Sequence, residues 1–301
     1  DTLQTLFMLI ALGVGIYYVS EGLGISGSGI LTTISESDLS QIFFFEDYKS
    51  GQYFIKQFIS GAFIAIVMTG LDQDMMQKNL TCRNLKDAQK NMFWFTLVLT
   101  VVNIIFLGLG LLLTLYAQQN GIDAEKDKLF STIAVDSGLG IGLAVFFLLG
   151  LIAAAYSSAD SALTSLTTSF SIDILDIEKK HSKKDQVKIR KRVHIGMSLL
   201  LIFVIIFFNY AIGDTSVILK LFTFAGYTYG PLLGLYAFGL FSNWKVKDKW
   251  VPLIAILTPF VGYAISYFSE LWFGFEFGFF ILILNGLLTY IGLVLVRAQQ
   301  N

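Results

Sequence analysis

Eight stretches of the chain are each about as long and as apolar as a helix that crosses a lipid bilayer. The hydrocarbon core of a bilayer requires about 20 apolar residues in helical form, and a helix satisfies its own backbone hydrogen bonds inside lipid. The sequence therefore predicts an all-α integral membrane protein with about eight transmembrane helices, at residues 2–20, 53–71, 92–117, 139–170, 193–212, 215–241, 250–269 and 271–297.

The composition agrees with a chain that is surrounded by lipid. Charged residues make up 14% of the sequence and hydrophobic residues 55%, whereas about a quarter of a soluble domain is charged. The net charge is −1, and binding to nucleic acid needs a concentrated excess of Lys and Arg. We therefore expect the lipid bilayer as a partner and no nucleic acid.

The positions of the basic residues predict the orientation in the membrane. Short cytoplasmic loops carry an excess of Lys and Arg, and three alternate connections, at residues 72–91, 171–192 and 242–249, are basic. If every predicted helix crosses once, these loops share the cytoplasmic face. The prediction is a multi-pass protein of the plasma (cytoplasmic) membrane with a cytoplasmic C-terminus, in which the run from Glu178 to Arg192 is a solvated, charge-rich linker.

Neither a hydrolase nor a transition-metal site is indicated. The stretch Ser157–Ser161 offers hydroxyls, but a serine nucleophile needs a base and no histidine lies at membrane depth. His181 and His194 fall in or beside the basic loop, and no second ligand stands at a zinc-site spacing. We expect no enzyme activity, no catalytic residues and no zinc or haem.

The predicted helix at residues 139–170 is unusually polar for a membrane helix. Many hydroxyls and Asp160 lie between Ile152 and Thr168, which is costly unless they face protein, water or an ion. At helical spacing Ser157 and Ser161 share one face, so that their oxygens can converge on a hard cation. Alternatively, the serines bond back to preceding carbonyls and the small residues pack against other helices.

Four segments resemble the sodium:solute symporter family, in the family's order and over nearly the whole chain. AAAYSSADSALTSLTTSFSIDIL at residues 153–175 resembles the sodium-site helix, and GLDQDMMQKNLTCRNLKDA at residues 70–88 resembles a cytoplasmic segment. These two matches are specific. GYTYGPLLGL at residues 226–235 and DTLQT at residues 1–5 are similar to two further helices of the family and are less specific.

The resemblance implies an architecture. The family has a five-plus-five inverted repeat of the leucine-transporter type, with ions and substrate near the middle of the membrane at discontinuous helices. Residues 1–301 would form a single transmembrane transporter domain, which matches the C-terminal two-thirds of the family and carries extra C-terminal helices. We expect a fragment that lacks the first four core helices, including the broken helix that completes the common sodium site.

The resemblance also implies ion ligands, with Na⁺ as the bound metal and coupling ion. Ala154, through its carbonyl, Ser157 and Ser158 would hold the sodium ion that is common to the family. A possible second sodium site would involve an aspartate that matches Asp1, with hydroxyls around Ser157 and Ser161. Asp160 stands where the family often has a serine, and its carboxylate either strengthens this site or serves as a proton or structural group.

The substrate pocket is expected at the predicted helices 53–71 and 215–241. Sugar-transporting members place an amide and an aromatic where this chain has Ala65 and Met68, which disfavours a sugar. The candidate pocket residues are the polar groups of these helices, each of which can equally be a packing or capping residue: Gln57, Ser60, Thr69, Thr223 and Tyr227.

Two functions follow from the resemblance and stay open. The first is a sodium-coupled symporter that moves an unidentified small solute. The second is a non-transporting membrane anchor or sensor portion of a signalling protein with the same fold. The sequences that flank residues 1 and 301 in the gene would distinguish them, because upstream core helices favour transport and a downstream soluble signalling domain favours sensing.

Overall fold

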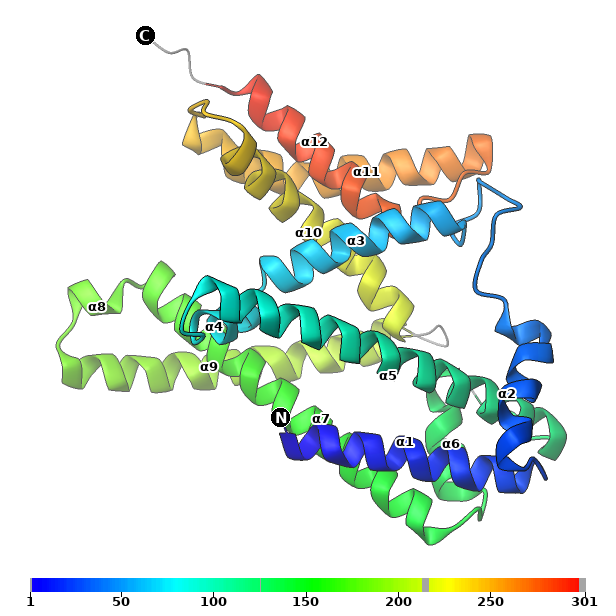
Figure 1. Cartoon of the computed structure of the whole chain (residues 1–301). Helices are drawn as coiled ribbons and strands as arrows, with labels where there is room; N and C mark the ends of the chain where they lie inside the picture. Colours follow the sequence, from blue (N-terminus) through cyan, green and yellow to red (C-terminus); the bar gives the residue numbers. More distant parts are fainter. Residues whose placement is uncertain (1, 125, 213–216, 298–301) are drawn as a thin grey trace. The chain divides into compact units, whose positions relative to one another are not determined.

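The computed structural model describes residues 2–124, 126–212 and 217–297 of the chain, and most of these residues are helical (Figure 1). Among them no strand forms, apart from an isolated antiparallel bridge between Val246 and Arg297. The chain divides into two compact units, of which the first comprises residues 1–40 and 77–214 and the second residues 41–76 and 215–301. The prediction of an all-helical chain is confirmed for the described residues.

Each of the eight predicted apolar stretches contains a helix. Six helical segments of the described chain are long and apolar enough to cross a membrane: α1 (Thr2–Gly22), α5 (Leu85–Asn120), α7 with its π-helical end (Ile141–Ile174), and the segments Lys183–Phe208, Asp248–Phe273 and Gly278–Leu295. The other two stretches form α3 (Phe54–Gly70) and α10 (Val217–Phe241). The number of crossings, the single-domain organisation and the inverted repeat stay predictions.

Two helices begin earlier than predicted. Helix α5 begins at Leu85, and α9 (Lys183–Ile212) begins at Lys183. The sequence from Lys183 to Arg192 is rich in Lys, Arg and Gln, which are good helix formers. The prediction of a linker from Glu178 to Arg192 is therefore wrong for most of its length, because α8 (Ile177–Lys180) and the first turns of α9 occupy it.

The last predicted stretch, residues 271–297, is divided between two helices. Helix α11 (Val251–Phe273) continues to Phe273 and ends at Gly274, whose φ of 63° lies in the left-handed region. A glycine adopts this conformation without a Cβ penalty and commonly ends a helix. Helix α12 (Ile281–Leu295) begins seven residues later, after a short 3₁₀ turn.

In the first unit, α1 packs against α5 and α7. The buried core of this contact is apolar and includes Leu12, Leu109 and Leu112. On α7, Gly150 lies against the backbone of Phe7 and Met8. Tyr18 lies against residues 140–142, at the start of α7, so α1 and α7 run antiparallel.

In the second unit, glycines of α10 and α11 let the helices approach α12 closely. Gly226, Gly230 and Gly234 are spaced four residues apart on α10 and face α12, an arrangement typical of membrane helix contacts. Asn285 of α12 is fully buried, and its Nδ2 lies 3.5 Å from the Gly226 carbonyl oxygen, to which it donates. The amide of Asn285 fills the space left by the missing side chain of Gly262 on α11.

Two threonines extend this polar contact between the helices. The hydroxyl of Thr289 donates to the Asn285 carbonyl oxygen at 2.8 Å and lies 2.9 Å from the hydroxyl of Thr258 on α11. Both threonines are buried. Hydrogen bonds between buried hydroxyls help to hold membrane helices together, so α11 and α12 are joined by polar contacts as well as by close packing.

A loop contact also lies in the second unit, between the segment before α3 and the segment before α12. Lys56 is buried, and its Nζ donates to the carbonyl oxygens of Lys49 at 3.0 Å and Glu276 at 2.9 Å. The same ammonium lies 3.7 Å from the ring centroid of Phe275. The Glu276 carboxylate accepts a bond from the backbone N–H of Gly51 at 2.9 Å. One lysine thus joins two loops that lie more than 200 residues apart in the sequence.

We predict that Gly262→Ala destabilises the protein. The added methyl group would overlap the Asn285 side chain, and overpacking of this kind costs about 1–3 kcal/mol. Thermal unfolding of the purified complete gene product measures the effect. Gly239→Ala is the matched control, because a methyl group at Gly239 of α10 meets nothing within 4 Å and alanine favours a helix. Equal stability of the two variants would contradict the packing described.

We predict that Lys56→Met loosens the two loops. The substitution removes two charge-assisted hydrogen bonds, each of which contributes about 1.5–3 kcal/mol, so hydrogen exchange should accelerate roughly tenfold or more in residues 49–53 and 275–278. Hydrogen exchange with mass spectrometry measures the rates. Lys49→Met removes the same charge from the same loop without removing the contacts of the Lys56 ammonium. The prediction fails if both variants exchange alike.

Candidate functional site

The candidate ion site lies on α7, whose α-helical part spans Ile141–Ser169 and continues as a π-helical turn at Phe170–Ile174. Ser157, Ser161 and Ser165 follow one another at intervals of four residues and therefore lie on one side of the helix. Ser157 and Ser161 are half-buried, and Ser165 is buried. The polar stretch thus forms a continuous hydroxyl face along about two turns of the helix.

The three residues of the expected common sodium site lie near the middle of this helix. Ala154 and Ser157 are half-buried, and Ser158 is exposed. Their chemistry suits sodium, because hydroxyl and carbonyl oxygens are the ligands of hard cations, and a helical carbonyl keeps a second lone pair. Such ions take about six oxygens or more, so α7 by itself supplies only part of a coordination shell.

The candidate second site is described only in part, because Asp1 lies outside the described residues. Asp160 and Ser161 are both on α7, and the side chain of Asp160 is exposed. Asp160 belongs to a segment that is long and apolar enough to cross a membrane. A carboxylate that faces lipid at this depth is costly, so we expect this side of α7 to face protein, water or an ion in the membrane.

Two polar groups near the end of α7 were missed by the sequence analysis. Ser165 is buried, and its hydroxyl has no hydrogen-bond partner among the described residues. The spacing of four residues from Ser161 could have identified it. Thr167 lies 3.2 Å from Nδ1 of His194 through its hydroxyl. This contact joins α7 to α9, and the sequence analysis, which placed His194 in or beside the basic loop, did not foresee it.

The candidate substrate residues lie in the second unit and are not gathered at one point. Gln57 donates through Nε2 to the Gly51 carbonyl oxygen at 2.7 Å, so its amide holds the loop before α3. Ser60 is 1% exposed, and its hydroxyl has no partner among the described residues. Thr69 is half-buried near the other end of α3. Twelve residues, about 18 Å of helix, separate Gln57 from Thr69, which is too far for one small pocket.

The two candidates on α10 lie one turn apart. Thr223 is exposed, and Tyr227 is half-buried. The ring of Tyr227 is 6.1 Å from the ring of Tyr263 on α11, and its side chain lies near Ser266 of the same helix. These contacts hold the tyrosine ring against α11. They fit a packing role as well as a substrate contact.

No transition-metal geometry accompanies the hydroxyl face. Within residues 2–124, 126–212 and 217–297, no group of three or more His, Cys, Asp or Glu side chains is close enough together to hold a metal ion. The candidate site is instead made of hydroxyl and carbonyl oxygens with a single carboxylate. This donor set suits a weakly bound monovalent cation better than a tightly held divalent metal.

Comparison with known proteins relates the chain to a sodium symporter. No family model matches the sequence. The chain is 25% identical over 209 residues to the sodium/sialic acid symporter SiaT of Proteus mirabilis (strain HI4320), and the similarity covers 65% of this chain and 41% of that protein. The chain therefore spans less than half of the length of this relative. The similarity supports a relationship to sodium:solute symporters.

We predict that Ser60→Ala and Ser165→Ala leave stability unchanged or slightly increased when sodium is absent. Both hydroxyls are buried and have no hydrogen-bond partner within the described part of the chain, and removal of an unsatisfied polar group is neutral or stabilising. Thr289→Val is the matched control, since it removes the bonds to Asn285 and Thr258 and should cost about 1–3 kcal/mol. Thermal unfolding in a potassium buffer measures all three variants. A loss in Ser165→Ala as large as that in Thr289→Val would reveal a partner for this hydroxyl.

Proposed function

We propose that the chain is part of a sodium-coupled symporter, which moves a small solute across the plasma membrane together with Na⁺. The observation that carries the proposal is the hydroxyl face of α7, formed by Ser157, Ser161 and Ser165 on a helix of membrane length, with Ser158 and Asp160 exposed beside it. The similarity to a sodium/sialic acid symporter supports the choice of sodium as the coupling ion.

In the proposed mechanism, sodium acts by selecting one conformation. Ions that enter down their gradient bind to oxygens of Ala154, Ser157 and Ser158, and this binding favours the outward-facing state that accepts solute. Rocking of one helix bundle against another then exposes both sites to the cytoplasm. A ligand shifts such an equilibrium only by its difference in affinity for the two states, so sodium must bind less tightly after the change.

The proposed second sodium site would add a carboxylate to this scheme. Asp160 and Ser161 lie one turn beyond the common site on the same helix, and Asp1 would complete the site from the start of the chain. A carboxylate at this depth also suits a proton-binding or structural role, which transport at different pH values and sodium concentrations would separate from a role in binding sodium.

The identity of the solute is a narrower question. Ala65 and Met68 replace the amide and aromatic groups that the resemblance places in sugar transporters, which argues against a sugar. The relative is named for sialic acid, which is an acidic sugar. Uptake assays with sialic acid, a neutral hexose and an amino acid would distinguish these classes.

We predict that sodium stabilises the complete gene product more than potassium does at equal ionic strength. A bound ion stabilises by mass action, by about 2.7 kcal/mol at a hundred times its dissociation constant. Ser158→Ala should remove most of this difference, because it deletes one of the proposed ligands. The control is Thr96→Val on α5, which deletes an exposed hydroxyl that bonds only to the preceding turn in the described contacts.

Four outcomes would contradict the proposed sodium site or the proposed transport. Equal thermal stability of the protein in sodium and in potassium would show that the protein does not bind sodium selectively. If Ser158→Ala and Thr96→Val reduced the sodium-specific stabilisation equally, the sodium site would not be at Ser158 on α7. Solute uptake into vesicles that does not depend on sodium would contradict coupling, and sodium binding without uptake of any solute would favour the non-transporting anchor or sensor.

A further inference from the structure

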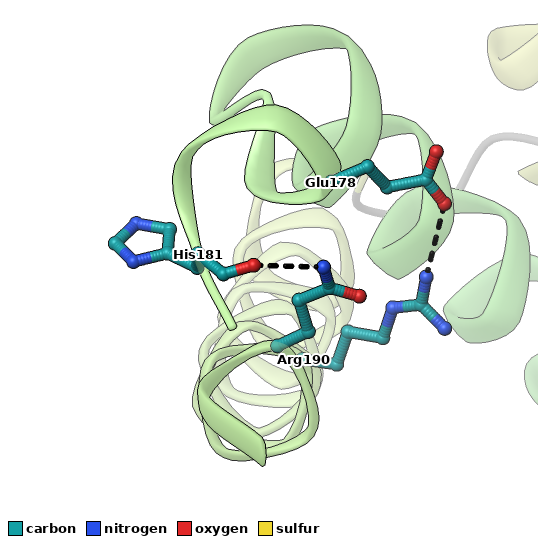
Figure 2. Close-up of polar contacts among 4 residues, drawn as sticks. Glu178, His181 and Arg190 are labelled. Carbon is teal, nitrogen blue, oxygen red and sulfur yellow. Dashed lines mark hydrogen bonds and ion pairs between the residues drawn. The ribbon is translucent and has the colours of Figure 1, made fainter. Parts of the chain in front are cut away.

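The basic segment at residues 176–192, called the basic hairpin below, is a folded structure. Figure 2 shows the contacts that hold its two arms together: Arg190 pairs with Glu178 at 3.6 Å, and the side-chain amide of Gln186 donates to the His181 carbonyl oxygen at 3.0 Å. Ile177 is fully buried beneath α8. The segment therefore presents its charges from a defined surface rather than from an unfolded linker.

The acidic residues of the basic hairpin are occupied by contacts within it. Asp176 pairs with Lys179 at 3.7 Å, Glu178 pairs with Arg190, and Asp185 accepts a hydrogen bond from the Ser182 hydroxyl at 2.6 Å. Eight basic and three acidic residues give the segment a charge of +5. Six of the basic side chains are exposed and form no ion pair within the described residues: Lys180, Lys183, Lys184, Lys188, Lys191 and Arg192.

The depth of these charges follows from the continuity of α9. The helix runs without a break from Lys183 into the apolar stretch that begins at Val193, so Arg192 lies where the hydrocarbon core begins. At about 1.5 Å per residue, Lys188 lies about 6 Å further out and Lys183 about 14 Å. The headgroup layer of one leaflet is roughly 5–8 Å thick. Lys188, Lys191 and Arg192 thus lie at headgroup depth, and Lys183 and Lys184 lie further out on the same helix.

We infer that the basic hairpin binds the headgroups of anionic phospholipids in the cytoplasmic leaflet. Basic residues beside a membrane helix attract anionic lipids, and each adds to the attraction. The six unpaired charges extend along the surface at and above headgroup depth, and they are exposed rather than gathered around a buried cradle. This geometry fits a sheet of lipid phosphates better than a single soluble phosphate. The inference does not depend on transport.

Titration of the complete protein in nonionic detergent with phosphatidylglycerol, read by native mass spectrometry, tests the inference. Lys188→Gln/Arg192→Gln removes two charges at headgroup depth and should weaken lipid binding about tenfold or more. Lys86→Gln/Lys90→Gln is the matched control. It removes two exposed charges at the same spacing from the start of α5, where residues 83–91 carry a net charge of +2 against +5 in the basic hairpin, and because less charge is concentrated there it should weaken binding by no more than about threefold. Equal losses in the two variants would overturn the inference.

Two further measurements separate lipid binding from other causes. Inorganic phosphate at millimolar concentration should not displace the lipid, and displacement would assign the surface to soluble anions instead. Thermal unfolding in phosphatidylcholine nanodiscs checks that the variants fold. If Lys188→Gln/Arg192→Gln does not fold, Lys180→Gln/Lys184→Gln removes two charges from outside the apolar span and should still weaken phosphatidylglycerol binding. Unchanged binding in that second variant would also overturn the inference.

Discussion

The structure depends on the inability of lipid to form hydrogen bonds. Every backbone N–H and C=O at membrane depth must find a partner within the protein, and a helix provides those partners along its own length. This requirement explains why the described residues are helical and why the breaks between helices carry the polar and charged side chains. It also makes every polar side chain inside a span a feature that needs a physical explanation.

Three polar side chains inside the apolar helices differ in their hydrogen bonding. Asn285 of α12 lies against α10 and α11, where missing glycine side chains make room for its amide, and its Nδ2 donates to a backbone oxygen. Thr289 bonds within the same contact. On α7, Ser165 has no hydrogen-bond partner among the described residues. Asn285 and Thr289 hold neighbouring helices together by hydrogen bonds, although the Asn285 Oδ1 accepts none among the described residues. The hydroxyl of Ser165 makes no hydrogen bond among those residues and can serve a ligand or water.

The sequence was sufficient to locate the long apolar helices, but not the short helices Gly27–Glu36, Gln73–Leu80 and Leu129–Asp136 or the contacts between helices. Apolar length identified all eight helical stretches, because the thickness of the bilayer sets that length. The starts of α5 and α9 were missed, because charged helix formers continue a helix beyond the lipid. The burial of Lys56, Ser165 and Asn285 depends on neighbours that are distant in the sequence. Local sequence patterns do not predict such neighbours. Gln57 was considered either a substrate-pocket residue or a capping residue. The hydrogen bond from its side-chain amide to the Gly51 carbonyl oxygen fits the capping role.

The boundary at Arg192 also bears on the depth of the hydroxyl face of α7. His194 lies two residues inside that boundary and contacts Thr167, so Thr167 lies near the edge of the hydrocarbon core. Ser157 precedes Thr167 by ten residues, which is about 15 Å of helix and about half of a core of roughly 30 Å. Ser157 and Ser158 would therefore lie close to the middle of the membrane. Hydroxyls in the middle of the membrane are furthest from bulk water, so they are costly without a polar partner. A bound ion would be such a partner.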